Sequence, residues 1–142
     1  MKRAQRKARE LRRKLKLSGR VDAETVASIL GLEVVTWPLD VQEEMQMDRY
    51  ICVAERLDSR WRRWVIAHAI GHRLLHSGNH LWIRDHTSLG SLFEREAEDF
   101  ARALLMDVDE AMAEGLSELW EVAEHFGVPQ EMAWLQPPLP ME

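Results

Sequence analysis

The sequence predicts an α+β fold that is mainly helical, with a small antiparallel sheet in its N-terminal half. Apolar residues recur at helical spacing in several segments, β-branched residues concentrate at 32–37, and glycines follow the helical segments. The composition, with 46% hydrophobic and 30% charged residues, is typical of a globular chain. We therefore expect residues 1–142 to form a single domain.

Residues 1–20 predict a basic helix. Ten of them are Lys or Arg against one Glu, so this segment carries +9 and the other 122 residues carry −14. Its apolar residues fall at helical spacing, which predicts a stripe that packs against the rest of the chain. They are Ala4, Ala8, Leu11 and Leu15. A basic arm on an acidic body is also compatible with contact to nucleic acid, although a run of charge alone is weak evidence.

The next segments predict one helix and three short strands. Asp22 has the position of a helix N-cap, and Gly31 has that of the residue that ends a helix. Strands are expected at 32–37, which is β-branched and ends before a proline, and at 45–47 and 50–54. These three strands make up the predicted antiparallel sheet.

Two longer helices follow. Asp58 or Ser59 caps the first of them, which runs to about His76. Residues 77–90 are polar and typical of a loop, and the second helix covers 91–106.

The C-terminal part predicts a helix, a turn and a helix. Ser117 caps the first helix, Gly127 ends it, and Pro129 begins the second. Residues 137–142 are rich in proline and predict an extended tail. Such a helix pair occurs in DNA-binding proteins, but residues 107–142 contain no Lys or Arg, which phosphate contact requires. The sequence therefore argues against nucleic acid as a partner.

Several classes of protein are excluded by simple counts. The sequence has no run of 18 apolar residues, so a membrane-spanning helix is not expected. No apolar stretch follows the basic first residues, as it would in a secretory signal. Cys52 is the single cysteine, which excludes an internal disulfide and a cysteine-based zinc site. These observations predict a cytoplasmic protein that does not associate with membranes.

The segment W-V-I-A-H-A-I-G-H-R-L-L-H, Trp64 to His76, is the most informative for chemistry. His68 and His72 are four residues apart, so on a helix their rings project from one face. That spacing lets two imidazoles bind one zinc ion. Both histidines fall on the apolar, inward stripe, where an unsatisfied polar group costs about 1–3 kcal/mol. A metal ion is one partner that would satisfy them.

The following helix offers a third ligand in F-E-R-E-A-E-D-F-A. Glu94 and Glu98 share one face, so Glu94 can bind the metal and Glu98 can accept a hydrogen bond from a ligand imidazole. Glu96 and Asp99 then point away. The alternative is a site without metal, in which His68 donates to a backbone carbonyl and Glu94 pairs with an arginine.

Other histidines lie nearby in the sequence. His76 follows His72 at the same spacing and either replaces His68 as a ligand or hydrogen-bonds at the helix end, which we favour. His80 and His86 belong to the polar loop and are candidates for lining a cleft.

Two segments, I-A-H-x-x-G-H-x-L-L-H and E-R-E-A-x-x-F-A-x-x-L-L-M, resemble the ImmA/IrrE family of zinc metallo-endopeptidases. The likeness extends over about residues 21–126. It implies a zincin-like metallopeptidase fold and places His68, His72 and Glu94 on the zinc-ligand positions. Several members of this family cleave transcriptional repressors, often of the helix-turn-helix type. The resemblance therefore implies a transcriptional regulator or a peptide as the partner.

The sequence departs from the family at one position that hydrolysis depends on. In H-E-x-x-H the glutamate acts as the general base, whereas this motif reads H-A-I-G-H with Ala69 at that position. A methyl group cannot transfer protons, and loss of a positioned general base commonly costs about 10²–10⁴ in rate.

Three interpretations fit Ala69, and they leave open whether the chain is an enzyme. The favoured one is a zinc-binding, regulatory, metallopeptidase-like protein whose hydrolytic activity is in question. The second is a non-catalytic pseudopeptidase that binds a transcriptional regulator or a peptide. The third is an active peptidase inactivated by an engineered substitution, for which the surrounding residues give no evidence.

Overall fold

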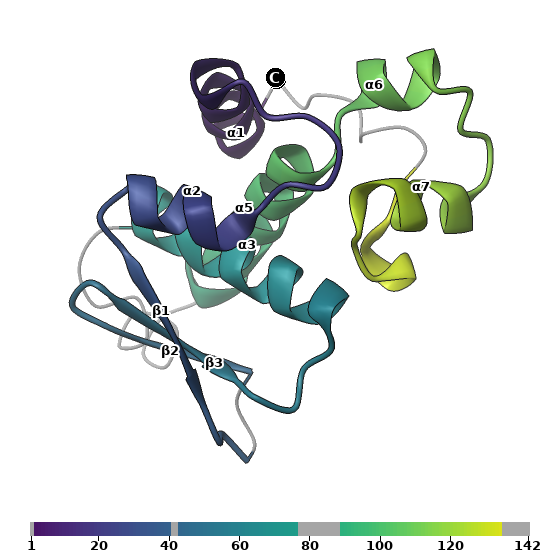
Figure 1. Cartoon of the computed structure of the whole chain (residues 1–142). Coiled ribbons are helices and arrows are strands. Elements are labelled where there is room, and N and C mark those ends of the chain that lie inside the picture. Colours follow the sequence, from purple (N-terminus) through teal and green to yellow (C-terminus); the bar gives the residue numbers. More distant parts are fainter. Residues whose placement is uncertain (1, 41–42, 77–88, 135–142) are drawn as a thin grey trace.

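The fold is mainly helical with one small sheet, as the sequence predicts (Figure 1). The computed structural model describes residues 2–40, 43–76 and 89–134. His80, His86 and the proline-rich tail 137–142 lie outside the described residues. In chain order the elements are α1 (Arg3–Leu15), α2 (Ala23–Ile29), β1 (Glu33–Trp37), β2 (Glu44–Met47), β3 (Tyr50–Ala54), α3 (Ser59–Leu75), α5 (Leu89–Leu105), α6 (Val108–Ala113), α7 (Leu119–Phe126) and the 3₁₀ turn η1 (Gln130–Met132).

The sheet is mixed, which corrects the prediction of a purely antiparallel sheet. Its strand order is β1-β3-β2, with β2 antiparallel and β1 parallel to the central β3. Cys52 of β3 faces Val35 of β1 on one side and Met45 of β2 on the other. A two-residue connection makes β2 and β3 a hairpin. Because β2 reverses the direction of the chain between them, β3 runs the same way as β1.

Side-chain oxygens begin two of the helices as predicted. Asp22 accepts a hydrogen bond from the Thr25 N–H at 3.1 Å, and Asp58 accepts one from the Trp61 N–H at 2.9 Å. Such N-caps satisfy backbone donors that the helix leaves free. Helix α2 ends before Gly31, whose φ of 81° is a left-handed conformation that glycine adopts without strain.

The core lies where α3 and α5 pack together, with α3 against one face of the sheet. Helix α3 contacts β2 and β3 on one side and α5 on another, and α1 covers the far side of α5 (Figure 1). Fully buried side chains come from β3, α3 and α5: Ile51, Val53, Ile66, Ile70, Phe100 and Leu104. The two longest helices are therefore fixed against each other over their lengths.

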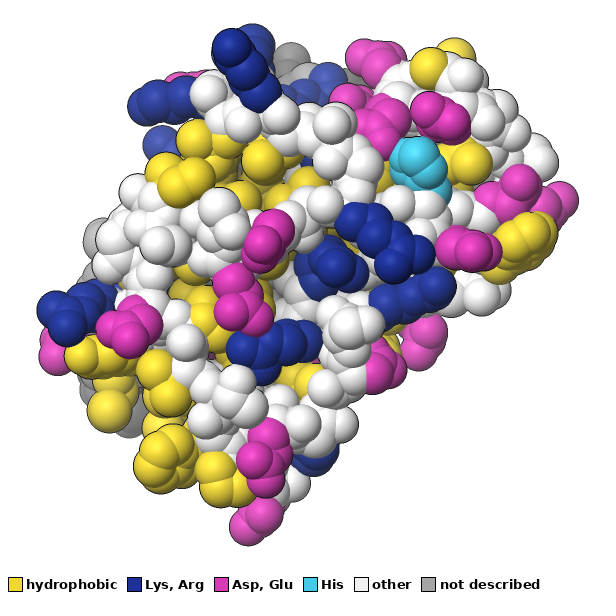
Figure 2. All heavy atoms as spheres, in the orientation of Figure 1, with side chains coloured by type: hydrophobic (Ala, Val, Ile, Leu, Met, Phe, Trp, Pro, Cys, Tyr) yellow, Lys and Arg dark blue, Asp and Glu magenta, His cyan; other side chains and the backbone are white. Residues whose placement is uncertain are grey.

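Helix α1 is part of this core, in agreement with its predicted apolar stripe. Ala4 and Ala8 are buried, and the side chain of Arg12 is only 7% exposed. Arg12 donates to the carbonyl oxygen of Leu104 at 2.5 Å. Burial lowers the pKa of Arg12, and the neighbouring carboxylate of Asp107 opposes that shift. The outer face of α1 carries the exposed basic side chains, seen in dark blue at the top of Figure 2.

A second lobe, formed by α6, α7 and η1, lies at the opposite end of the molecule from the sheet (Figure 1). Asp107 caps α6 by accepting a hydrogen bond from the Asp109 N–H at 3.0 Å. Helix α7 begins one residue later than predicted, with Glu118 rather than Ser117 as its N-cap. It ends at Gly127, where the backbone is left-handed with φ of 67°.

Two arginines from outside this lobe bind the carbonyl groups at the end of α7. Arg20 Nη2 donates to the Glu124 carbonyl at 2.6 Å, and Arg63 Nη1 donates to the Gly127 carbonyl at 2.5 Å. Arg63 also donates through Nε to Val21, at 2.9 Å. The basic side chains that separate α3 from α7 form the dark blue group near the centre of Figure 2.

None of the helices in residues 2–40, 43–76 and 89–134 is both long enough and apolar enough to cross a membrane.

Candidate metal centre

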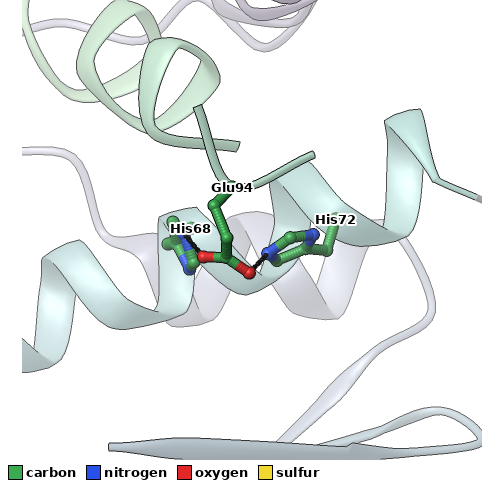
Figure 3. A group of neighbouring side chains, drawn as sticks. All are labelled: His68, His72 and Glu94. Carbon is green, nitrogen blue, oxygen red and sulfur yellow. Dashed lines mark ion pairs between the residues drawn. The ribbon is translucent and has the colours of Figure 1, made fainter. Parts of the chain in front are cut away.

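Three of the predicted site residues come together in the structure. His68 and His72 project from α3 toward Glu94, which lies near the start of α5 (Figure 3). His68 Nε2 lies 3.2 Å from Glu94 Oε2, and His72 Nε2 lies 3.1 Å from Glu94 Oε1. One carboxylate therefore contacts both rings. In each ring the contact is with Nε2, the nitrogen farther from Cβ. This is the group that the motif spacing predicted.

The donor set of this group fits a zinc ion. Two imidazole nitrogens and one carboxylate oxygen are typical of zinc sites that keep one position open. In this structure one such atom from each residue lies within 4.8 Å of the others. His72 is 1% exposed, whereas the side chain of Glu94 is 35% exposed. The group is thus buried on one side and accessible on the other.

The electrostatics of the group favour a cation. Burial lowers the pKa of His68, but its interactions with the carboxylates of Glu44 and Glu94 outweigh that effect and raise the pKa to about 9. Hydrogen bonds from His68 and then His72 lower the pKa of Glu94 well below its ordinary value, against the opposing effect of burial. The carboxylates of Glu44 and Glu94 therefore favour positive charge at His68, and a metal ion is another source of such charge.

A carboxylate from the sheet lies behind His68. Glu44 Oε1 is 3.8 Å from His68 Nδ1, which is within ion-pair range but longer than a hydrogen bond. Gln46 fixes Glu44 by donating to its Oε2 at 3.2 Å, and Arg73 donates to Gln46 Oε1 at 2.7 Å. Glu44 was not predicted to lie at the site, because the strand predicted at 45–47 begins one residue after the observed start of β2. Strand alternation is the signal that could have found it, since Glu44 and Gln46 share one face.

A second histidine and a second carboxylate lie behind His72. His76 Nδ1 is 3.1 Å from His72 Nδ1, and His76 Nε2 is 3.2 Å from Glu96 Oε1. His76 thus hydrogen-bonds at the helix end, which is the role we favoured over metal binding. Burial lowers its pKa, and the hydrogen bond to Glu96 opposes that shift.

Two of the three other acidic residues that were weighed on α5, Glu98 and Glu96, also have partners in the structure. Glu98, expected to accept a hydrogen bond from an imidazole, has a side chain that is 42% exposed and lies 3.8 Å from Arg102 Nη1. Glu96, expected to point away, contacts His76 instead. Glu96 lies about 200° around the helix from Glu94. His76, at the end of α3, contacts α5 on the side where Glu96 lies. The residue pattern within α5 alone does not predict this contact between two helices.

Ala69 lies at the position where the motif of the family has its general base. Its side chain is fully buried and belongs to the hydrophobic core. A methyl group at this position supports packing and offers no group that transfers protons.

Comparison with known proteins agrees with this fold. The model of the Peptidase M78 family, the IrrE N-terminal-like domain, matches residues 27–134. No curated protein matches the sequence. Among solved structures, a Mycobacterium tuberculosis transcriptional regulator aligns with a TM-score of 0.70 and 20% sequence identity. The alignment covers 91% of this chain and 44% of that chain, so the likeness concerns the fold and less than half of the regulator. With the family match over most of its length, the chain belongs to the family of IrrE N-terminal-like domains.

Proposed function

We propose that the chain is a zinc-binding, regulatory, metallopeptidase-like domain that has little hydrolytic activity of its own. The observation that carries this proposal is the convergence of His68, His72 and Glu94 from two helices, with Ala69 in the general-base position. Family membership supports it, because the family is of the metallopeptidase type. The cytoplasmic location and the single domain over 1–142 stay predictions from the sequence.

The residues have separate roles in this proposal. His68 and His72 would bind the ion through Nε2, and Glu94 would offset part of its charge through a carboxylate oxygen. When bound, zinc acts as a Lewis acid toward a carbonyl oxygen. Hydrolysis would also need a group that takes a proton from the attacking water and returns it to the leaving amine. Ala69 cannot do either, so binding is retained and turnover is lost.

A binding role without catalysis is the second candidate. It is favoured by the combination of complete metal ligands and a missing base, and by the structural likeness to a transcriptional regulator. In this role the metal site would hold a peptide segment of a partner, such as a helix-turn-helix regulator. The third possibility is an active peptidase in which position 69 was substituted deliberately.

Metal content tests the first part of the proposal. Protein purified without chelator should contain about one zinc per chain, as three ligands and an open position require. His72→Ala should lose the metal, because it removes the most buried of the three ligands. Absence of zinc in the parent, with no uptake at micromolar zinc and neutral pH, would refute the assignment.

Cleavage of a candidate helix-turn-helix repressor tests the catalytic part, with Ala69→Glu and Ala69→Gln as a matched pair. The two side chains have nearly the same shape, but only glutamate can act as a base. The parent and Ala69→Gln should be inert, and Ala69→Glu is the change most expected to give chelator-sensitive cleavage.

Each result of that assay selects one interpretation. Activity in Ala69→Glu alone would show that the rest of the site is intact. Silence from all three forms, when each matches the parent in zinc content and in its free energy of unfolding, would favour the binding role. Cleavage by the parent would contradict the loss of hydrolysis and would require another base.

A further inference from the structure

We propose that His76 and Glu96 position His72 for metal binding, through a chain of hydrogen bonds that holds its ring with Nε2 directed at the candidate metal centre. The chain runs from Glu96 through His76 to His72, behind the candidate metal ligands. The inference rests on the proposed metal site, and it extends that site by two residues whose roles the ligand motif does not define.

The first link sets the proton of His76. Glu96 Oε1 lies 3.2 Å from His76 Nε2. A carboxylate accepts hydrogen bonds, so the nitrogen that faces it carries the proton. A neutral imidazole has one donor and one acceptor nitrogen, which leaves Nδ1 of His76 as the acceptor.

The second link joins His76 to His72. Nδ1 of His76 lies 3.1 Å from Nδ1 of His72, so one of these atoms must donate. Nε2 of His72 lies 3.1 Å from Glu94 Oε1, in the candidate metal centre. If that nitrogen binds a metal ion it has no proton, so Nδ1 carries the proton of the neutral ring and donates to His76 Nδ1.

The same two links give His76 a supporting role. One of its nitrogens faces His72 and the other faces Glu96. Histidine ligands commonly donate their second N–H to a carboxylate or carbonyl, which fixes the tautomer and makes the ligand more basic. Here His76 lies between the candidate ligand His72 and the carboxylate of Glu96, so the arrangement is longer by one imidazole ring.

The surrounding packing holds the chain of hydrogen bonds in place. His76 is 6% exposed, and its ring stacks on Phe93 with centroids 4.0 Å apart and planes inclined by 19°. Arg3 of α1 donates to the Leu75 carbonyl at 2.7 Å, and its other guanidinium nitrogen lies 3.9 Å from Glu96 Oε2. The basic helix α1 therefore supports the outer end of the chain from Glu96 to His72.

Ring-nitrogen spectroscopy on the parent protein tests the inference directly. Long-range proton–nitrogen NMR correlations distinguish the two tautomers of each histidine in the zinc-loaded protein. We expect His76 to carry its proton on Nε2 and His72 to carry its proton on Nδ1. A proton on Nδ1 of His76 would overturn the proposal.

A matched pair of variants on α5 tests the consequence for metal binding. Glu96 and Asp99 each form an ion pair at the N-terminal end of α1. Glu96 Oε2 lies 3.9 Å from Arg3 Nη1, and Asp99 Oδ2 lies 3.5 Å from Lys2 Nζ. Glu96 also contacts a histidine, whereas the described contact of Asp99 is the one with Lys2. Glu96→Ala should lower zinc affinity about 10–100-fold, which is the usual cost of removing a group that supports a ligand. Asp99→Ala should change it by less than about twofold.

Zinc affinity is measured by competition with a chromophoric chelator, and the NMR measurement is repeated on both variants. A mixture of His76 tautomers in zinc-loaded Glu96→Ala, with the parent pattern in Asp99→Ala, would support positioning. Equal zinc affinities for the two variants would overturn it. A parent that binds no zinc would refute the proposed function, whereas equal affinities in variants of a parent that does bind zinc would refute the positioning alone, so the two failures are distinct.

Discussion

Gly71 of α3 lies directly against Phe100 of α5. A Cβ atom at Gly71 would be 3.0 Å from Cδ1 of Phe100, 3.2 Å from its Cβ and 3.3 Å from Cα of Ala97. These neighbours belong to the backbone or to a fully buried ring, so they have little room to move. The absence of a side chain at Gly71 thus lets the helix with His72 approach the helix with Glu94.

Gly71→Ala should therefore destabilise the fold although alanine is the better helix former. Overpacking costs about 1–3 kcal/mol, and the gain in helix propensity returns about 1 kcal/mol. We expect a net loss of about 1 kcal/mol in the free energy of unfolding, measured by urea denaturation, and weaker zinc binding as α3 and α5 separate. Unchanged stability together with unchanged zinc affinity would show that the contact between Gly71 and Phe100 does not limit how closely α3 and α5 approach each other.

Zinc should stabilise the chain by holding α3 and α5 together. Ligand at about 100 times its Kd adds about 2.7 kcal/mol to the free energy of unfolding, and a chelator should reverse the gain. Glu94→Gln should abolish this stabilisation, whereas Glu98→Gln, on the same helix, should keep it because Glu98 pairs with Arg102. Thermal unfolding with and without zinc measures both. Equal losses in the two variants would contradict the assignment of Glu94.

Arg12 should contribute far more to stability than its neighbour Arg13. Arg12 is buried and satisfies the carbonyl of Leu104, while Arg13 is exposed. Arg12→Ala removes a buried charge-assisted hydrogen bond and should cost about 3 kcal/mol. Arg13→Ala should stay within about 0.5 kcal/mol of the parent. Similar urea midpoints for the two variants would mean that α1 is not held by this contact.

Glu110 should make stability depend on pH in the acidic range. It accepts hydrogen bonds from the Gly19 N–H at 3.0 Å and lies 2.6 Å from His125 Nε2. Burial raises the pKa of Glu110, but the hydrogen bonds from His125 and Gly19 outweigh it, so the pKa is lowered. The stabilisation is therefore complete above the ordinary carboxyl pKa of about 4.3, and it is lost as the pH falls through the lower folded-state value.

Glu110→Gln should accordingly cost about 1–3 kcal/mol at neutral pH, and the difference from the parent should shrink at strongly acidic pH. Urea denaturation across the acidic range measures this. Glu114→Gln, an exposed position on the same lobe, is the control and should match the parent throughout. A difference that stays constant with pH would exclude the ionised carboxylate as its source.

Duplex DNA should bind only weakly despite the basic α1. One face of this helix is buried against α5, and the rest of the chain carries −14, which repels phosphate. We expect a Kd above micromolar at physiological salt, measured by fluorescence anisotropy, and no loss when the exposed Lys7 and Arg9 are replaced by glutamine. A tighter, strongly salt-dependent affinity would make nucleic acid a partner.

Local signals predicted the helices and the grouping of the candidate site because their causes lie within a few residues. Asp22 and Asp58 cap helices through their own side chains, and the spacing of His68 and His72 on one helix already fixes their common face. Glu94 followed from a motif of the same local kind. The structure brings these three side chains together, while their binding of a metal stays a prediction.

Features that depend on how elements cross were not predictable in this way. The parallel pairing of β1 with β3 is set by strand order, for which the sequence between them carries no periodic signal. The preference of His76 for Glu96 depends on where the end of α3 meets α5. Glu44 reaches the site only because the hairpin folds over α3.

The attachment of α7 has a consequence for how this surface can vary between related proteins. Arg20 and Arg63 donate hydrogen bonds to the backbone carbonyl oxygens of Glu124 and Gly127, and every residue type has such an oxygen. These hydrogen bonds therefore do not depend on the identity of most α7 side chains. The outward residues of that helix, such as the exposed Trp120, are free to diverge without detaching it. Substitutions there would change the chemistry of this exposed surface while leaving the place of α7 in the molecule unchanged.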